Sequence, residues 1–257
     1  MDYATVEEAK DRGGLRLALT MGVPGPWSQA AKYIFEYKNI PYLAVGQKGA
    51  RENPELFAWT HHRNAPVAVY EDEVPRTGWH EIIMLGERLA PEPSLLPAGS
   101  GARAEMFGLI TEIASEGGFA WLRRLRLIDI LYGALDDPKD RFRPDTLASR
   151  YGHALGEAGA AEQAEEGCGQ IMAMLADKLR AQAEKGSDYF VGDGFTAADL
   201  YWACFSQLAE PFPPDINPMR PLLRTAYEAP AGLFVDPILI NHRDTMYDRH
   251  LSLPLEF

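Results

Sequence analysis

The chain contains little cysteine. Its 257 residues include two cysteines, Cys168 and Cys204. Two cysteines are too few for a disulfide framework and are typical of the reducing cytoplasm, which is where we expect the protein. Both stand among small or apolar neighbours, so we interpret them as small buried hydrophobic residues.

Positive charge and long apolar runs are also scarce. The chain has 25 lysines and arginines against 37 aspartates and glutamates, a formal net charge of −12. Nucleic-acid binders carry a basic surface that neutralises phosphates, so we expect no nucleic-acid partner. No apolar run reaches the ~18 residues that span a bilayer, and the first residues lack the pattern of a signal peptide. The composition therefore predicts an acidic soluble protein with no membrane partner.

The sequence also lacks histidines, cysteines and acids at the spacing of metal ligands. His61 and His62 are adjacent, and no third histidine, cysteine or acid stands at ligand spacing from them. Structural zinc sites take four such ligands and catalytic zinc sites take three. We therefore predict no metal site.

The first 90 residues alternate short apolar strands with helical segments. Prolines at the first helical position, together with apolar periodicity, predict helices that begin at Pro26 and Pro54 and a third over residues 77–89. Alternating apolar runs predict strands over residues 15–20, 42–45 and 66–70 and a fourth near Val74. The predicted order is β-α-β-α-β-β-α.

A proline-rich connector over residues 91–97 separates this region from the rest of the chain. Beyond it the periodicity predicts helices over residues 102–132, 160–185, 196–209 and 221–227 and a polar loop over 136–145. The acidity belongs mainly to this part, because residues 1–90 hold 12 acids and 10 bases whereas residues 91–257 hold 25 acids and 15 bases. We expect domains over residues 1–90 and 98–257.

Three short motifs occur in this framework. The first is Gly-Pro-Trp-Ser at residues 25–28, followed by Asn-Ile-Pro-Tyr at 39–42. The second is Asn-Ala-Pro-Val at residues 64–67, before the third strand, and the third is Phe-Thr-Ala-Ala-Asp-Leu at 195–200. In the third motif Thr196 and Asp199 have the spacing of a capping box, in which two side chains satisfy backbone amides at a helix start.

In this order and spacing the motifs resemble those of the glutathione S-transferase family, over about residues 15–210. The resemblance implies a thioredoxin-like βαβαββα domain followed by an all-α helical bundle domain, in a homodimer. It implies glutathione as co-substrate, and a reaction in which the bound glutathione thiolate attacks an electrophilic apolar small molecule.

Two departures from the family pattern leave other functions open. Gly25 stands where a cysteine or serine usually precedes the turn proline, so we expect no cysteine nucleophile. Residues 77–81 lack the serine that usually helps to bind the γ-glutamyl carboxylate. The alternatives are a non-catalytic protein of this fold that binds glutathione or another ligand, and an enzyme that uses another ligand in the same cleft.

Ser28 and Thr20 are the candidate catalytic residues. Ser28 falls in the first turn of a helix, whose N-terminus favours a thiolate, and its hydroxyl is the candidate contact for the sulfur. Its alternative role is a local hydrogen bond in that turn. Thr20 ends the first strand, near where tyrosine-using branches of the family place their hydroxyl; its alternative role is that of a β-branched strand residue.

The candidate glutathione-binding residues come from three segments: Trp27, Asn64, Ala65, Pro66, Thr77 and Glu81. The resemblance implies a cis Ala65–Pro66 bond beside which the tripeptide pairs like an added strand; a trans proline at an edge strand is the alternative. Thr77 is the expected N-cap of a helix whose amides hold an anion. Glu81 either receives an α-amino group or faces the helix dipole, and Trp27 either walls the site or packs in the core.

A basic island lies in the acidic half of the chain. Residues 121–126 read Trp-Leu-Arg-Arg-Leu-Arg and supply Trp121 and Arg124 as candidate residues of the substrate pocket. A contact with a dimer partner or pairing with nearby acids are the alternatives.

Overall fold

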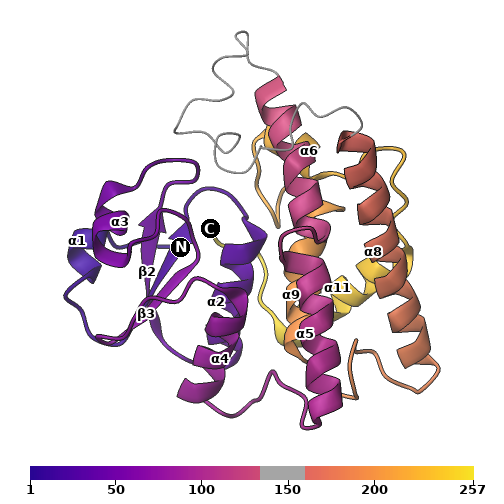
Figure 1. The fold of residues 1–257 in the computed structure, drawn as a ribbon, viewed down its shortest axis with the longest axis horizontal. Helices are drawn as coiled ribbons and strands as arrows, with labels where there is room; N and C mark the ends of the chain where they lie inside the picture. Colours follow the sequence, from indigo (N-terminus) through magenta and orange to yellow (C-terminus); the bar gives the residue numbers. More distant parts are fainter. Residues whose placement is uncertain (134–159) are drawn as a thin grey trace. The chain divides into compact units, whose positions relative to one another are not determined.

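The structure, a computed structural model, describes residues 1–133 and 160–257, so the loop expected over 136–145 lies outside the described residues. The chain divides into two compact units (Figure 1). Unit 1 comprises Met1–Leu95 together with Leu253–Phe257, and unit 2 comprises Leu96–Ser252.

Unit 1 follows the predicted thioredoxin-like order of elements, except that it has one additional helix at its start and lacks the fourth strand. Its elements are α1 (Val6–Ala9), β1 (Leu15–Thr20), α2 (Pro26–Tyr37), β2 (Tyr42–Gln47), α3 (Pro54–Thr60), β3 (Val67–Tyr70) and α4 (Trp79–Leu89). The additional helix, α1, begins with a capping box in which Thr5 and Glu8 bond each other's backbone amides.

The sheet has the strand order β2-β1-β3. β1 runs parallel to β2, with Thr20 opposite Gln47, and antiparallel to β3, with Ala18 opposite Val67. In place of the fourth strand expected near Val74, one bridge joins Ala68 to Arg76. Pro75 precedes that bridge, and a proline has no amide hydrogen with which to extend a ladder.

Helices cover both faces of this sheet (Figure 1). Ala18, Val45, Val67 and Val69 point to one face, where α1 and α3 complete an apolar cluster. α2 and α4 pack together, and α2 packs on β1. Because both faces are buried, the strands are apolar on both sides, and the open positions are at the strand ends.

A buried lysine holds the end of α2 in place. The side chain of Lys38 is fully buried, and its ammonium lies 2.7 Å from the Glu87 carboxylate. The same nitrogen donates to the carbonyls of Ala90, at 2.7 Å, and Pro93, at 2.8 Å. Since a buried charge is tolerated only when it is paired and hydrogen-bonded, these contacts join α2, α4 and the proline-rich connector.

The described part of unit 2 contains helices and no strand, which confirms the predicted all-α region. Its elements are α5 (Ser100–Ala114), α6 (Phe119–Gly133), α8 (Ala160–Ala183), α9 (Ala197–Phe205), the 3-10 helix η2 (Ser206–Leu208), α10 (Pro221–Tyr227) and α11 (Pro237–His250). All nine residues of α9 are buried, with α5 and α11 packed against it. None of the described helices is long and apolar enough to cross a membrane.

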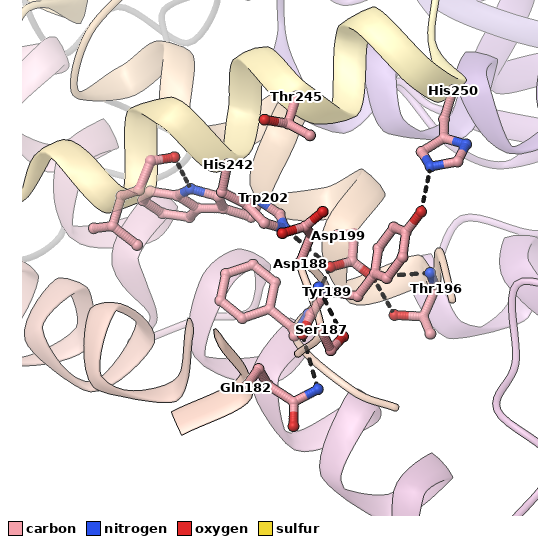
Figure 2. Close-up of polar contacts among 12 residues, drawn as sticks. Gln182, Ser187, Asp188, Tyr189, Thr196, Asp199, Trp202, His242, Thr245 and His250 are labelled. Atoms are coloured by element: carbon pink, nitrogen blue, oxygen red, sulfur yellow. Dashed lines mark hydrogen bonds and ion pairs between the residues drawn. The ribbon is translucent and has the colours of Figure 1, made fainter. Parts of the chain in front are cut away.

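A buried carboxylate organises the start of α9 (Figure 2). Asp199 is fully buried and accepts hydrogen bonds of 2.8 Å from both the amide and the hydroxyl of Thr196, which confirms the predicted capping box. It also accepts the Phe190 amide at 2.8 Å and lies 3.0 Å from His242 Nε2 on α11. Four groups from three segments therefore depend on one side chain.

A second histidine of α11 lies at the edge of this cluster. The His250 ring stacks on Phe195 with centroids 4.3 Å apart. Its Nε2 lies 3.0 Å from the Tyr189 hydroxyl (Figure 2). Burial lowers the pKa of His250 below 6.5, and the nearby Asp199 charge opposes that effect. The folded state therefore favours the neutral ring.

Replacing Asp199 with alanine is expected to destabilise unit 2 by about 3 kcal/mol or more, because several buried donors lose their acceptor at once. Chemical unfolding monitored by circular dichroism measures the change. Asp193→Ala, at an exposed position near α9, is the matched control and should leave the unfolding midpoint nearly unchanged. Equal midpoints for the two variants would contradict the organising role of Asp199.

His250 is expected to make stability depend on pH between about 7.5 and 5.5. Its pKa in the folded state lies below the unfolded value of 6.5, so the unfolded chain binds more protons and stability falls as the pH drops through 6.5. Urea unfolding at several pH values should show a shallower decline in His250→Gln than in the wild type. Asn241→Gln, at an exposed position of the same helix, removes no titratable group and should keep the wild-type slope.

Candidate functional site

Four predicted segments of unit 1 meet at one edge of its sheet. β1 and β2 are parallel and end together at Thr20 and Gln47, and antiparallel β3 begins at this edge. The Ala68–Arg76 bridge joins β3 to a residue that stands two positions before Gly78, the N-cap of α4. The start of α2 follows β1 directly, so this edge, here called the Thr20 edge, also holds the starts of α2 and α4.

Ser28 and Thr20 bind each other across this edge. The Thr20 amide donates to Ser28 Oγ at 3.2 Å, and the Ser28 hydroxyl lies 3.4 Å from Thr20 Oγ1 as a donor. Thr20 Oγ1 in turn donates to Gln47 Oε1 at 3.1 Å. Ser28 is only 4% exposed, so its hydroxyl is engaged inside the unit, with β1 rather than with its own helical turn.

Gln47 extends this network to the segment before Pro66. Its side chain is buried, and its amide donates at 2.9 Å to the carbonyls of Lys48 and Arg63. The Arg63 carbonyl also accepts from Asn53 at 3.1 Å. Sequence reasoning did not identify Gln47, because a lone glutamine at a strand end carries no motif; its position opposite Thr20 follows only from strand pairing.

The start of α2 has no side-chain cap. Its N-cap is Gly25, and Pro26 occupies the first helical position, as the sequence predicts. A Cβ built on Gly25 would meet nothing within 4 Å, so a larger residue would fit there. Trp27, in the first turn, is half-buried. The dipole of this helix end favours a negative charge nearby.

The Ala65–Pro66 peptide bond is cis, as the motif predicts. Ala65 is half-buried and Asn64 is exposed. Ala65 stands two residues before β3, and among the described residues no hydrogen-bond partner is found for its backbone. An extended peptide could therefore pair with this backbone in the manner of an added strand.

The start of α4 differs from the prediction in its cap. Gly78, not Thr77, is the N-cap. Glu81 turns back so that its Oε2 accepts from the amides of Gly78, at 3.0 Å, and Thr77, at 3.3 Å. The acid of a capping box stands three residues after the cap, and Glu81 has this spacing from Gly78. The Glu81 carboxylate thus faces the dipole in the first turn of α4, which is one of the two roles predicted for it.

Trp121 and Arg124 are neighbours on α6 in unit 2. The Arg124 guanidinium lies 5.2 Å from the centroid of the Trp121 ring, and both side chains are half-buried. Arg123 is buried and donates to the carbonyls of Leu208, at 2.7 Å, and Glu228, at 2.8 Å. Burial lowers the pKa of Arg123. Arg123 therefore has a structural role, because it joins α6 to the segments that contain Leu208 and Glu228.

Residues of α2 beyond Ser28 contact the segment Leu253–Phe257. Gln29 and Lys32 are both buried, and both approach the carbonyl of Glu256, Gln29 Nε2 at 3.0 Å and Lys32 Nζ at 3.5 Å. Lys32 also lies 3.8 Å from Glu36, and burial raises the pKa of that carboxyl. These contacts attach α2 to the segment Leu253–Phe257. No sequence motif indicated this attachment.

Among the described residues no group of three or more histidines, cysteines or acids could hold a metal ion. Both cysteines are free and buried, as predicted. Burial raises the pKa of the Cys168 thiol to about 12, which leaves it a poor nucleophile.

The chain is similar to known glutathione S-transferases in sequence and in fold. Residues 143–228 match the model of the glutathione S-transferase C-terminal domain. A glutathione transferase family member from Pseudomonas fluorescens, with two glutathione molecules bound, aligns with a TM-score of 0.65 at 14% identity, covering 97% of this chain and 98% of its own. The chain has the glutathione S-transferase fold. The resemblance inferred from the motifs is confirmed, and no curated protein matches by sequence.

Two further solved structures with this fold show its range. A glutathione S-transferase from Methylobacterium radiotolerans, in complex with glutathione sulfonate, is 16% identical with a TM-score of 0.60 and covers 91% of each chain. The yeast prion protein Ure2p, in complex with glutathione, is 13% identical with a TM-score of 0.61, covering 92% of this chain and 95% of its own. At these identities the likeness shows the fold, and the chain is a divergent example of it.

Replacing Gln29 with leucine is expected to loosen the segment Leu253–Phe257, because leucine keeps the volume but cannot donate to the Glu256 carbonyl. Hydrogen–deuterium exchange should show several-fold faster exchange in this segment and in the first turns of α2. Gln163→Leu, at an exposed position of α8, is the matched control. Unchanged exchange in Gln29→Leu would show that the segment is held by other contacts.

Proposed function

We propose that the protein is a glutathione-dependent transferase, in which the bound glutathione thiolate attacks an electrophilic apolar small molecule. The observation that carries the proposal is the backbone of Ala65, which has no hydrogen-bond partner within residues 1–133 and 160–257 and lies at the edge where two helix N-termini also gather. An extended anionic tripeptide needs a backbone partner and a positive helix end, and the Ala65 backbone and the start of α2 supply these.

In this proposal the cysteinyl portion of glutathione pairs with the backbone of Ala65, beside Pro66 and the exposed Asn64. One terminal carboxylate lies toward the start of α4 near Thr77. The free Oε1 side of Glu81 is available to an α-amino group, because Oε2 accepts the two backbone amides. Residues 1–90 are nearly neutral, with 12 acids and 10 bases, so an anionic ligand meets little repulsion.

The thiol then lies at the start of α2, beside Trp27. The positive end of the helix dipole stabilises the thiolate over the thiol and so lowers the pKa of the thiol. The thiol proton passes to solvent, the thiolate forms a sulfur–carbon bond, and the leaving group departs with its bonding electrons. Trp121 and Arg124 are the proposed contacts for the second substrate.

Ser28 and Thr20 have a shared role in this proposal. The Ser28 hydroxyl reaches the sulfur by turning away from Thr20 Oγ1, a bond that is long at 3.4 Å. The Thr20 hydroxyl remains on Gln47, so the network keeps α2 in place while Ser28 changes partner.

A non-catalytic glutathione-binding protein is the second candidate. The observation that favours it is the engagement of the Ser28 hydroxyl, which is nearly inaccessible and donates to Thr20. A third candidate, an enzyme for another ligand, is favoured by Glu81, whose carboxylate occupies backbone amides at the start of α4 where an anion would bind.

Glutathione is expected to bind the wild type with a dissociation constant at or below the millimolar range, and calorimetric titration measures it. The absorbance of the bound thiolate should give a pKa below the free thiol value of about 8.5. No heat of binding at several millimolar glutathione would contradict the proposal. Binding without a change in the pKa of the thiol would favour the non-catalytic candidate.

Ser28→Ala is expected to lower the rate of conjugation of an aryl halide about 10- to 100-fold while glutathione binding changes little, because the lost hydroxyl acts on the sulfur. Steady-state kinetics separates kcat from KM. Ser100→Ala, at an exposed position at the start of α5, is the matched control. An unaltered kcat in Ser28→Ala would shift the catalytic role to Thr20 or to backbone amides.

We also propose a cytoplasmic homodimer, since the resembling family is typically dimeric and both cysteines are free. Light scattering at micromolar concentration gives the mass, which is 57 kDa for two chains of 28.5 kDa.

A further inference from the structure

A groove of about 400 Å³ lies within unit 2, between α8 and the segment that leads into α11. Gly169, Met172 and Ala176, at spacings of three and four residues, contribute one wall from a single face of α8. The opposite wall comes from Leu233 and Phe234. No part of the proposed glutathione chemistry involves this groove.

The middle of the groove is apolar. Met172 and Ala176 are 1% exposed and Leu233 is 9% exposed, so they form a floor. Leu233 Cδ1 would lie 3.7 Å from a Cβ built on Gly169, which shows how closely the second wall approaches the helix. Phe234, in contrast, is 74% exposed although it lines the groove. A ligand in the groove would remove this aromatic surface from water, which is favourable.

The end of the groove near α11 carries a closed ion-pair cluster. The Arg180 guanidinium donates to Asp177 at 3.0 Å and to Asp236. Asp236 is also the N-cap of α11, accepting the Ile238 amide at 3.1 Å. These bonds raise the pKa of Arg180 and lower that of Asp236, so both groups are charged. The positive charge of Arg180 is thus balanced by two carboxylates at this end.

The other end of the groove is negative. Glu165 lies 3.7 Å from Arg126 Nε, a long ion pair. Glu166 is exposed and accepts from the side-chain amide of Gln170 at 3.2 Å, and no cation pairs with it among the described residues. Together with the cluster around Arg180, the lining holds four carboxylates against one arginine. A ligand with a positive group near Glu166 would be held by charge complementarity.

We propose that this groove binds an amphipathic organic cation. Its ammonium group lies against Glu165 and Glu166, and its aliphatic or aromatic body runs over Met172 and Ala176 beneath Phe234. The ten helical rises from Glu166 to Ala176 span about 15 Å, which suits a body of about eight to twelve carbon atoms. The charge selects cations, and the apolar floor selects an amine with a hydrophobic body over a polyamine.

The test is a calorimetric titration of the full chain with octyltrimethylammonium, with octyl sulfate as the probe of equal length and opposite charge. We expect the cation to bind at one site, at least 10-fold more tightly than the anion. Its affinity should fall as salt is added. Phe234→Ala should weaken cation binding at least 5-fold, and Glu166→Gln should weaken it about 3- to 10-fold. Both positions are exposed, so the fold should be kept, and thermal unfolding checks this.

Glu162→Gln on α8 and Leu222→Ala on α10 are the matched controls, since both positions are exposed and neither lines the groove. They should bind the cation like the wild type. No binding at millimolar cation, equal binding of the two probes, or full binding by Phe234→Ala would overturn the proposal. A wild-type dimer that Phe234→Ala dissociates would also overturn it, because a second copy would then cover the groove.

Discussion

The pairing of β1 with its two neighbours is the constraint on which unit 1 depends. β1 is the central strand, parallel to β2 and antiparallel to β3, so the ends of β1 and β2 and the beginning of β3 fall at one edge. A shift of one residue in this pairing would turn Ala18 and Val45 away from the cluster that α1 and α3 complete. The same shift would separate Thr20 from Gln47, and the Thr20 edge would lose its network.

Buried polar side chains then fix α2, the helix whose start faces this edge. Ser28 binds the end of β1, Gln29 and Lys32 bind the carbonyl of Glu256, and Lys38 binds α4 and the connector. Each contact satisfies a group that would be costly to bury alone. In unit 2, Asp199 has the corresponding role for α9. Polar groups thus set the positions of helices whose apolar packing alone would tolerate small displacements.

Local signals in the sequence predicted much of the fold. The prolines at the starts of α2 and α3, the Thr196–Asp199 capping box and the Pro66 motif specify structure within a few residues, so they could be recognised directly. Two local signals were misjudged or missed. Glu81 stands three residues after Gly78 and so marked the true cap of α4, and the Thr5–Glu8 pair marked α1. The prediction of a strand near Val74 was wrong, because Pro75 limits the pairing there to one bridge.

The sequence by itself determined the order of elements, the helix caps and the candidate residues around Ser28, Pro66 and Glu81, because these follow from contacts between residues close in the chain. Only the tertiary structure decided which partners those residues have. Gln47 joins Ser28 and Thr20 through strand pairing, and Gln29 meets Glu256 across 227 positions. The groove on α8 exists because Leu233 and Phe234 return to that helix. Such contacts depend on how distant segments pack, and no spacing in the sequence records them.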